Sequence, residues 1–268
     1  MSAGGVGLAA AGAAGLVAAQ AGPALTALDG VRLRLTPRLA GVGAAGHVAL
    51  TFDDGPVAAS TPAFLDVLAG RRWRATFFML GEEVRRAPGL AAEVAAAGHE
   101  VAVHGDDHRS LLRRGPLATV DGLRRARDAI GEATGAAPGW FRPPYGVLTG
   151  AALLGAASLG LRPVLWTAWG RDWRAEATPA SILAALAAGR VDGGTLLLHD
   201  YAASGSWRAT LAALPLLADL LAARGLAAGP LADHGLATPA GARRGPAAGH
   251  GLAPRPAGLR RGPAQRPA

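Results

Sequence analysis

The feature that most constrains the fold is a repeated alternation of short apolar runs with longer helical patterns across residues 47–236. The apolar runs end in polar loops, as strands do, and the intervening segments often begin near proline and close on glycine, as helices do. Strands that alternate with helices build a parallel sheet or a barrel, so the chain is predicted to be an α/β protein. Strands are predicted at residues 47–52, 75–80, 100–104, 139–142, 161–166, 194–199 and 225–231, and helices at 60–70 (capped by Ser60), 88–97, 117–134, 148–159, 179–188 and 207–223.

Two ends of different composition flank this region. Residues 1–46 form an Ala/Gly-rich leader, of which residues 3–22 carry no charged side chain. A signal peptide begins with positively charged residues, and this uncharged segment has none. Its Ala and Gly residues are also less hydrophobic than those of a typical membrane-spanning helix. The leader is therefore interpreted either as a signal or anchor, or as a packing helix or loose extension. Residues 237–268 are Pro, Gly, Ala and Arg without periodicity and are predicted to be a disordered basic tail.

Composition limits the possible partners. The chain has no cysteine, so a metal would be held by nitrogen and oxygen ligands. The net charge is +8, but six arginines and no acid lie after Thr238, which leaves +2 for the rest of the chain. A nearly neutral domain in a chain with 5% aromatic residues is a poor platform for nucleic acid, and no nucleic-acid partner is expected.

Polar residues gather where the predicted strands end. The first strand is followed by two aspartates, the third closes on a histidine, and the sixth also ends in a histidine. Active sites lie at the carboxyl ends of strands in both barrels and open α/β sheets. The residues at these positions are Asp53, Asp54, His104, Arg142, Asp172 and His199.

Two motifs indicate a metal site. TFDDGP (51–56) places adjacent carboxylates after a strand, where one can bind a cation while the other faces a substrate. HGDDH (104–108) places two histidines four residues apart, a spacing that suits metal binding. One carboxylate and two imidazoles leave a coordination position open for water, as in catalytic sites. A plain Asp-Gly-Pro turn and two surface histidines are the alternatives.

Three further motifs carry groups that suit amide hydrolysis. FRPPYG (141–146) places Arg142 where it can keep a carboxylate ionised, and its loop backbone can face an oxyanion. WTAWGRDW (166–173) supplies indoles that suit sugar faces, with Trp166 expected in the core. Asp172 beside His199 would raise the pKa of that imidazole and make it a general acid. A structural turn and a core histidine are the alternatives.

Taken together and in order, these motifs resemble those of the polysaccharide deacetylase family, carbohydrate esterase family 4, over residues 46–235. The resemblance implies a distorted (β/α) barrel and a metal-dependent hydrolase that removes N-acetyl groups from a glycan such as peptidoglycan or a chitin-like oligosaccharide. The matching segments are TFDDGP, HGDDH (for His-Ser/Thr-x-x-His), FRPPYG, WGRDW (for Asp-x-x-Asp-Trp) and LLLH (196–199).

The resemblance also implies roles for ten residues and a domain at 47–236. The metal, expected to be Zn²⁺ with Co²⁺ as an alternative, would be held by Asp54, His104 and His108. Asp53 would be the base and Arg142 its partner. Asp172 would orient His199, the acid. The backbone N–H of Tyr145 would stabilise the oxyanion, and Trp173 and Leu197 would line the pocket for the acetyl methyl group.

The sequence departs from the family pattern at two positions. Gly105 stands where Ser or Thr usually supports the ligand loop, and Trp169 stands where the fourth motif usually begins with Asp. Asp106 and Asp107 are interpreted as solvated loop charges.

The expected location is the cell envelope, with membrane or cell-wall association, and a cytoplasmic location is the alternative. Two other functions remain open. One is an amide hydrolase for a small-molecule or lipid-linked amino sugar, and the other is a non-catalytic envelope-binding protein whose basic tail grips an anionic polymer.

Overall fold

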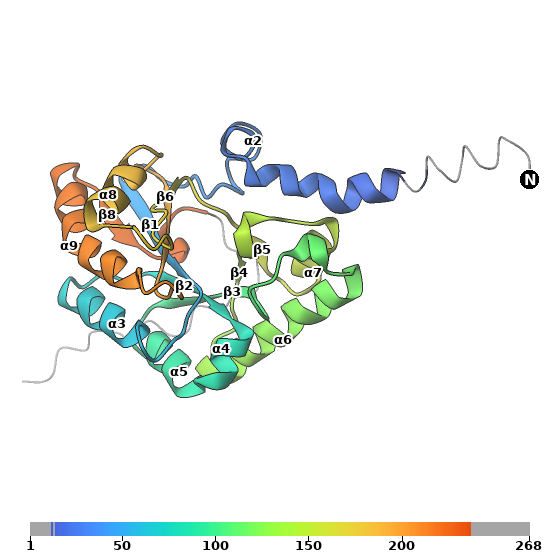
Figure 1. Ribbon diagram of the computed structural model, residues 1–268, viewed down its shortest axis with the longest axis horizontal. Helices are drawn as coiled ribbons and strands as arrows, with labels where there is room; N and C mark the ends of the chain where they lie inside the picture. Colours follow the sequence, from blue (N-terminus) through green and yellow to red (C-terminus); the bar gives the residue numbers. More distant parts are fainter. Residues whose placement is uncertain (1–11, 13, 237–268) are drawn as a thin grey trace, which may run out of the picture.

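A curled parallel sheet forms the centre of the molecule in the computed structural model, which describes residue 12 and residues 14–236 (Figure 1). Eight strands of this described part pair in the order β5-β4-β3-β2-β1-β7-β6, and β8 pairs with the start of β1. The strands are β1 (His47–Asp53), β2 (Thr76–Leu80), β3 (Glu100–Gly105), β4 (Trp140–Phe141), β5 (Arg162–Pro163), β6 (Ala168–Trp169), β7 (Thr195–His199) and β8 (Ala227–Gly229).

Helices cover the outside of the sheet, so the predicted α/β class with a distorted barrel is confirmed. They are α2 (Asp29–Leu35), α3 (Thr61–Gly70), α4 (Gly81–Arg86), α5 (Pro88–Ala96), α6 (Pro116–Thr134), α7 (Gly150–Ser158), α8 (Pro179–Ala187) and α9 (Trp207–Ala223). Short 3-10 helices are η1 (Gly22–Ala27), η2 (Leu111–Arg113), η3 (Pro144–Gly146) and η4 (Leu231–Asp233). The predicted disordered tail, 237–268, lies outside the described residues.

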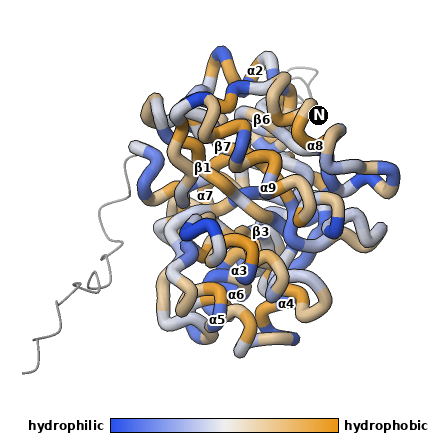
Figure 2. The backbone as a smooth tube through the Cα atoms, turned by 90° about the vertical axis from the view of Figure 1, so that its left-hand side faces the viewer, coloured by the Kyte–Doolittle hydropathy of each residue, from blue (hydrophilic) through white to orange (hydrophobic). Residues whose placement is uncertain are grey.

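Apolar side chains fill the space between the sheet and its helices. The rings of Phe64 and Phe77 lie 5.3 Å and 5.2 Å from that of Phe52, and all three side chains are buried. Aromatic pairs at such spacings add to the stabilisation that comes from burial. Figure 2 shows hydrophobic stretches on α3 and α9 and hydrophilic segments in peripheral loops.

The bounds of the long predicted helices and strands agree with the structure to within a few residues. The predictions and the structure differ mainly at short elements. The strand predicted at 161–166 is reduced to the two residues of β5, because Pro163 has no N–H to donate to a ladder. The two-residue β6 and the six-residue α4 were not predicted, since segments this short carry little periodicity. Ser60 occupies the N-cap position of α3 as predicted, but its hydroxyl makes no hydrogen bond among the described residues and so does not cap the helix.

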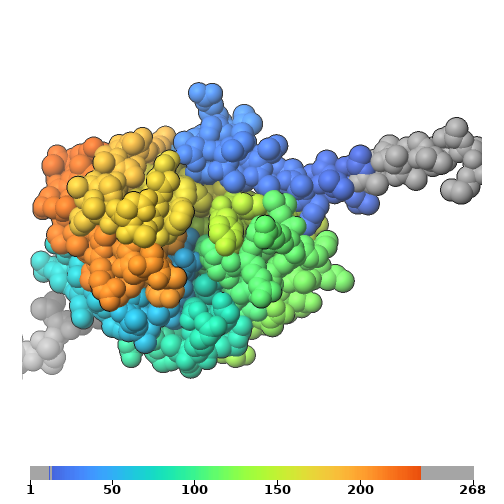
Figure 3. Space-filling model, viewed as in Figure 1, coloured from blue at the N-terminus to red at the C-terminus, as the bar shows by residue number. Residues whose placement is uncertain are grey.

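The described part of the leader packs against the domain. Residues 14–21 are helical, and Gln20 Oε1 accepts a hydrogen bond from the N–H of Ala151 at the start of α7. Figure 3 shows this blue segment against the green surface. Residues 14–19 of this helix are exposed, so its contact with the domain lies at its end, and the choice between a packing helix and a signal or anchor stays a prediction. Within residues 12 and 14–236, no helix combines the length and the apolar character that crossing a bilayer requires.

A buried arginine fastens the leader to the sheet. Arg32 is 1% exposed, its Nε donates to the carbonyl of Trp166 (2.9 Å), and its Nη1 donates to the carbonyl of Ala27 (2.9 Å). Its guanidinium also stacks on the indole of Trp166, with 4.7 Å to the ring centroid. Further along, the carbonyl of Leu39 accepts from the N–H of Leu165 (2.6 Å), so the leader follows the connection between β5 and β6.

Arg32→Ala should lower the free energy of unfolding by about 2 kcal/mol, because it leaves buried carbonyls without donors and removes a packed guanidinium. The midpoint of urea unfolding measures the loss. The matched control is Arg34→Ala, which removes an exposed arginine of the same helix. Equal midpoints for the two variants would show that Arg32 does not fasten the leader.

Candidate active site

Three potential metal ligands meet at the carboxyl ends of β1 and β3. Asp54 Oδ1 lies 3.4 Å from His104 Nε2 and 3.5 Å from His108 Nε2, and the three ligand atoms lie within 4.8 Å of one another. Asp54 directly follows β1 with φ +81°, an uncommon value for a residue other than glycine. The three residues that the sequence proposed as ligands therefore form one cluster.

The donor set of this cluster fits a divalent cation. His104 Nδ1 lies 2.9 Å from the carbonyl oxygen of Arg142, and a hydrogen bond donated there leaves the Nε2 lone pair facing Asp54. Burial lowers the pKa of His104 to about 3, which keeps the imidazole neutral. Asp54 Oδ1 is buried without a hydrogen-bond partner among the described residues. An orphaned carboxylate oxygen that faces two imidazoles is an arrangement that a cation would complete.

Ion pairs hold the loop that carries the two histidines. Asp106 lies 2.8 Å from Arg85 of α4 and 2.8 Å from Arg125 of α6, and Asp107 pairs with Arg114. The interpretation of these aspartates as solvated charges is therefore wrong. Side chains from two helices support the loop, and Gly105, at φ +114°, gives it a turn that an L side chain would strain.

A second carboxylate lies beside the cluster in a fixed orientation. Asp53 is 2% exposed, and its Oδ1 accepts a hydrogen bond from Arg142 Nη1 at 2.7 Å. The same Nη1 donates to Thr51 Oγ1, and Nη2 donates to the carbonyl of Leu165. Burial raises the pKa of Asp53, and the charge of Arg142 opposes that rise. The pairing that the sequence suggested is present.

A histidine–carboxylate pair ends β7. His199 Nδ1 lies 2.9 Å from Asp172 Oδ1, while Asp172 Oδ2 accepts from the N–H of His199 and from Thr210 Oγ1. Burial is the strongest single influence on His199 and lowers its pKa, but the carboxylates of Asp172, Asp54 and Asp53, with Asp172 foremost, together raise the pKa to about 10. The imidazole is therefore protonated at neutral pH, with Nε2–H as its free donor.

These groups share one cavity of about 370 Å³, in the hollow that Figure 3 shows between green and yellow segments. Eight of the ten predicted site residues line it, while Arg142 and Asp172 lie behind the residues that they hold. Those eight are Asp53, Asp54, His104, His108, Tyr145, Trp173, Leu197 and His199.

The cavity wall also contains residues that the sequence did not assign to it. Trp169 stacks on Trp173 with ring centroids 6.4 Å apart, and Trp166, 7% exposed and packed in the core as predicted, faces the cavity as well. Ala27 and Asp29 of the leader form part of the rim. Nothing in the sequence indicated that these two leader residues belong to the site, because they lie far from every motif and only the fold brings them to the cavity rim.

Two other features of the site were absent from the sequence interpretation. Tyr145 has φ +60° and places its ring 4.5 Å from that of His108, in an edge-to-face contact. Asp200, directly after β7, is buried and accepts a hydrogen bond from Thr61 Oγ1. Burial raises the pKa of Asp200 to about 7. Asp200 could have been proposed from the sequence because it directly follows the last motif, LLLH (196–199).

A parallel half-barrel with three potential metal ligands at its strand ends is the arrangement of a metal-dependent barrel protein, and the comparisons narrow that class. The family model for polysaccharide deacetylase matches residues 41–164. A chitooligosaccharide deacetylase from Bradyrhizobium is 39% identical over 194 residues, covering 69% of this chain and 88% of that protein. The family 4 carbohydrate esterase from Streptomyces lividans, solved in complex with acetate, has a TM-score of 0.62 and 35% identity, over 69% of this chain and 92% of that one.

The chain belongs to the polysaccharide deacetylase family. A peptidoglycan-N-acetylglucosamine deacetylase from Listeria monocytogenes is 34% identical over 154 residues, which cover 58% of this chain. The match spans only about a third (32%) of the Listeria protein's own length.

Asp54→Asn should weaken Zn²⁺ binding about 100-fold or more, because it removes the anionic ligand of a three-ligand set. Isothermal titration of the metal-stripped protein measures the change. The matched control is Asp29→Asn, which neutralises another carboxylate of the same cavity. Equal affinities for the two variants would contradict a metal site at Asp54, His104 and His108.

Proposed function

We propose that the chain is a metal-dependent hydrolase that removes N-acetyl groups from an acetylated amino-sugar glycan of the peptidoglycan or chitin-like type. The observation that carries the proposal is the meeting, in one cavity, of the metal cluster, an arginine-held carboxylate and a carboxylate-held histidine. An amide resists hydrolysis because its carbonyl is a poor electrophile and its amine leaves badly unless it is protonated. The metal site and the arginine-held carboxylate address the poor electrophile, and the carboxylate-held histidine protonates the departing amine.

The proposed metal ligands are Asp54, His104 and His108, with Zn²⁺ as the expected ion and Co²⁺ as an alternative. When bound, a divalent cation supplies Lewis acidity, which lowers the pKa of water and polarises a carbonyl. The chain orients the ligands through the carbonyl of Arg142 and through the ion pairs of the ligand loop.

Asp53 is the proposed general base. Arg142 occupies its Oδ1, which leaves Oδ2 to take a proton from the attacking water. Because burial raises the pKa of Asp53, its carboxylate is a stronger base than one in water. Arg142 keeps the carboxylate ionised and prevents it from rotating.

His199 is the proposed general acid. Asp172 holds Nδ1, so the proton on Nε2 is the one that passes to the departing amine. The backbone N–H of Tyr145 is assigned to the oxyanion, and Leu197 and Trp173 are assigned to the acetyl methyl group. Both side chains line the cavity, and Leu197 is 3% exposed, as a small apolar subsite requires.

Residues 47–236 are assigned to the catalytic domain, with the leader adding Ala27 and Asp29 to its rim. A cell-envelope location is proposed from the similarity to a peptidoglycan deacetylase. The leader rim and Trp169 also favour a second candidate, a hydrolase for a small or lipid-linked amino sugar, because both enclose the cavity. Activity on monomers that exceeds activity on oligomers would favour this second candidate.

The metal-loaded protein should release acetate from N-acetylglucosamine oligomers, measured by an enzymatic acetate assay. Asp53→Asn should lower the rate at least about 100-fold, because the attacking water then has no base. The same variant should still bind Zn²⁺ in a titration. Failure of the folded, metal-loaded protein to release acetate from a panel of acetylated glycans would refute the proposed function.

Asp172→Asn should move the basic limb of the pH–rate profile to lower pH by more than about one unit. Asp172 is the main group that raises the pKa of His199, and without it burial lowers that pKa. Less His199 then carries its proton as the pH rises, so activity is lost at lower pH than in the wild type. The matched control is Thr210→Val, which removes one hydrogen bond to Asp172 but keeps its charge. An unshifted basic limb in Asp172→Asn would rule out His199 as the acid.

A further inference from the structure

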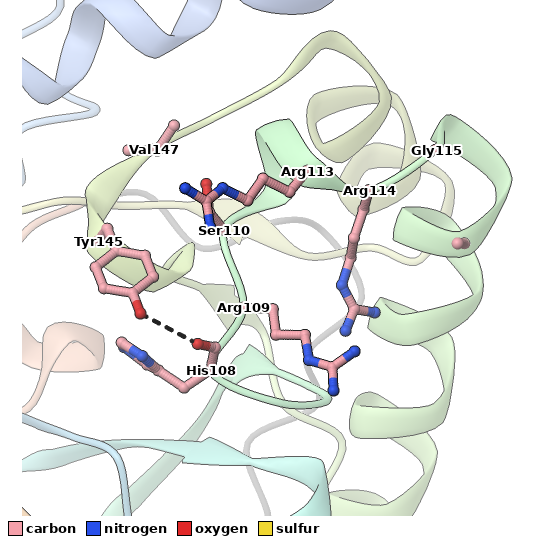
Figure 4. A pocket seen from close by; sticks show the side chains of 9 residues that line it. His108, Arg109, Ser110, Arg113, Arg114, Gly115, Tyr145 and Val147 are labelled. Carbon is pink, nitrogen blue, oxygen red and sulfur yellow. Dashed lines mark hydrogen bonds between the residues drawn. The ribbon is translucent and has the colours of Figure 1, made fainter.

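A second cavity adjoins the catalytic one and is lined by arginines. Its volume is about 930 Å³, and its wall is formed by the segment after the ligand loop, the start of α6 and the turn at η3 (Figure 4). The lining residues are His108, Arg109, Ser110, Arg113, Arg114, Gly115, Ala118, Tyr145 and Val147. The proposed mechanism uses neither Arg109 nor Arg113.

The charge of this cavity is positive and only partly compensated. Arg114 pairs with Asp107, while the Arg109 side chain is 79% exposed and reaches Asp107 only at 3.9 Å. Arg113 is exposed and forms no ion pair with the described residues. No carboxylate is among the described residues that line the cavity. Arginines that line a concave surface without acids suit a carboxylate or phosphate, which an arginine can bind through two N–H groups.

The start of α6 adds to this positive potential. Gly115 is the N-cap of this 19-residue helix and provides no side-chain acceptor for its first N–H groups. Gly115 and Ala118 both line the cavity. The amino end of a helix favours negative charge, in the same direction as the arginines.

The two cavities share a wall. His108 and Tyr145 line both of them, and Tyr145 Oη donates to the carbonyl of His108 at 3.4 Å, the dashed bond in Figure 4. A group bound in the arginine-lined cavity would therefore lie beside two residues that also face the catalytic cavity. A glycan that passes over this wall would present neighbouring sugars to the two cavities.

On the basis of the proposed function, we propose that this arginine-lined cavity binds an oxyanion carried by a sugar next to the one that loses its acetyl group. The substrate class is thereby narrowed to anionic glycans, in which a carboxylate or a phosphate accompanies the N-acetyl group. Arg109 and Arg113 are the contact residues, and Arg114, held by Asp107, shapes the cavity between them and α6.

The first test compares two glycans of equal length, one with free sugar carboxylates and the same one with those carboxylates amidated. The wild-type protein should prefer the free carboxylates in kcat/KM. The double variant Arg109→Ala/Arg113→Ala should reduce this preference about tenfold. Arg224→Ala, which removes an exposed arginine at the end of α9, is the matched control. A preference that is unchanged in the double variant, or absent in the wild type, would overturn the proposal.

The second test measures binding without turnover, so it remains decisive if the deacetylase function fails. Calorimetric titration of Asp53→Asn with the two glycans should give tighter binding of the anionic one, and adding Arg109→Ala/Arg113→Ala should remove the difference. A third titration, with a phosphate-bearing glycan, distinguishes a carboxylate site from a phosphate site. Whichever anionic glycan binds more tightly identifies the oxyanion that the cavity recognises. Equal affinity for the anionic and amidated glycans would overturn the proposal.

Discussion

The site depends on the hydrogen bonds of one buried residue, Arg142. Its guanidinium holds Asp53 and binds the carbonyl of Leu165, while its own carbonyl binds His104 Nδ1. One residue at the end of β4 therefore orients both the proposed base and a proposed metal ligand. Removing one partner of a buried charge pair leaves the other uncompensated, which is costly. A change at Arg142 would therefore disturb both the orientation of the site residues and the contacts between the strand ends that carry them.

Most charges buried at these strand ends have a partner. Asp53 has Arg142, His199 has Asp172, and Asp106 of the ligand loop has two arginines. Asp54 Oδ1 is the exception within the catalytic cluster, since no hydrogen bond from the described residues reaches it. Burying a carboxylate oxygen without a partner costs free energy, and a bound cation would remove that cost.

The pairs of carboxylate and basic group divide the proposed chemistry. Arg142 opposes the rise in the pKa of Asp53 that burial causes, whereas Asp172, with Asp54 and Asp53, raises the pKa of His199 to about 10 against the effect of burial. The arginine thus favours the carboxylate form of Asp53, and the carboxylates favour the imidazolium form of His199 in the same cavity. A base and an acid that coexist at one pH are what a two-proton hydrolysis requires.

The sequence by itself determined the fold class and the long elements, because these depend on local periodicity, and the order of its short motifs predicted the ten proposed site residues through the family resemblance. Only the tertiary structure decided that Ala27 and Asp29 reach the cavity rim, that Asp106 and Asp107 are paired, and that Arg109 and Arg113 line a cavity beside the site. The physical reason is that such contacts join residues from separate elements, and a sequence pattern does not record the path by which those elements come together.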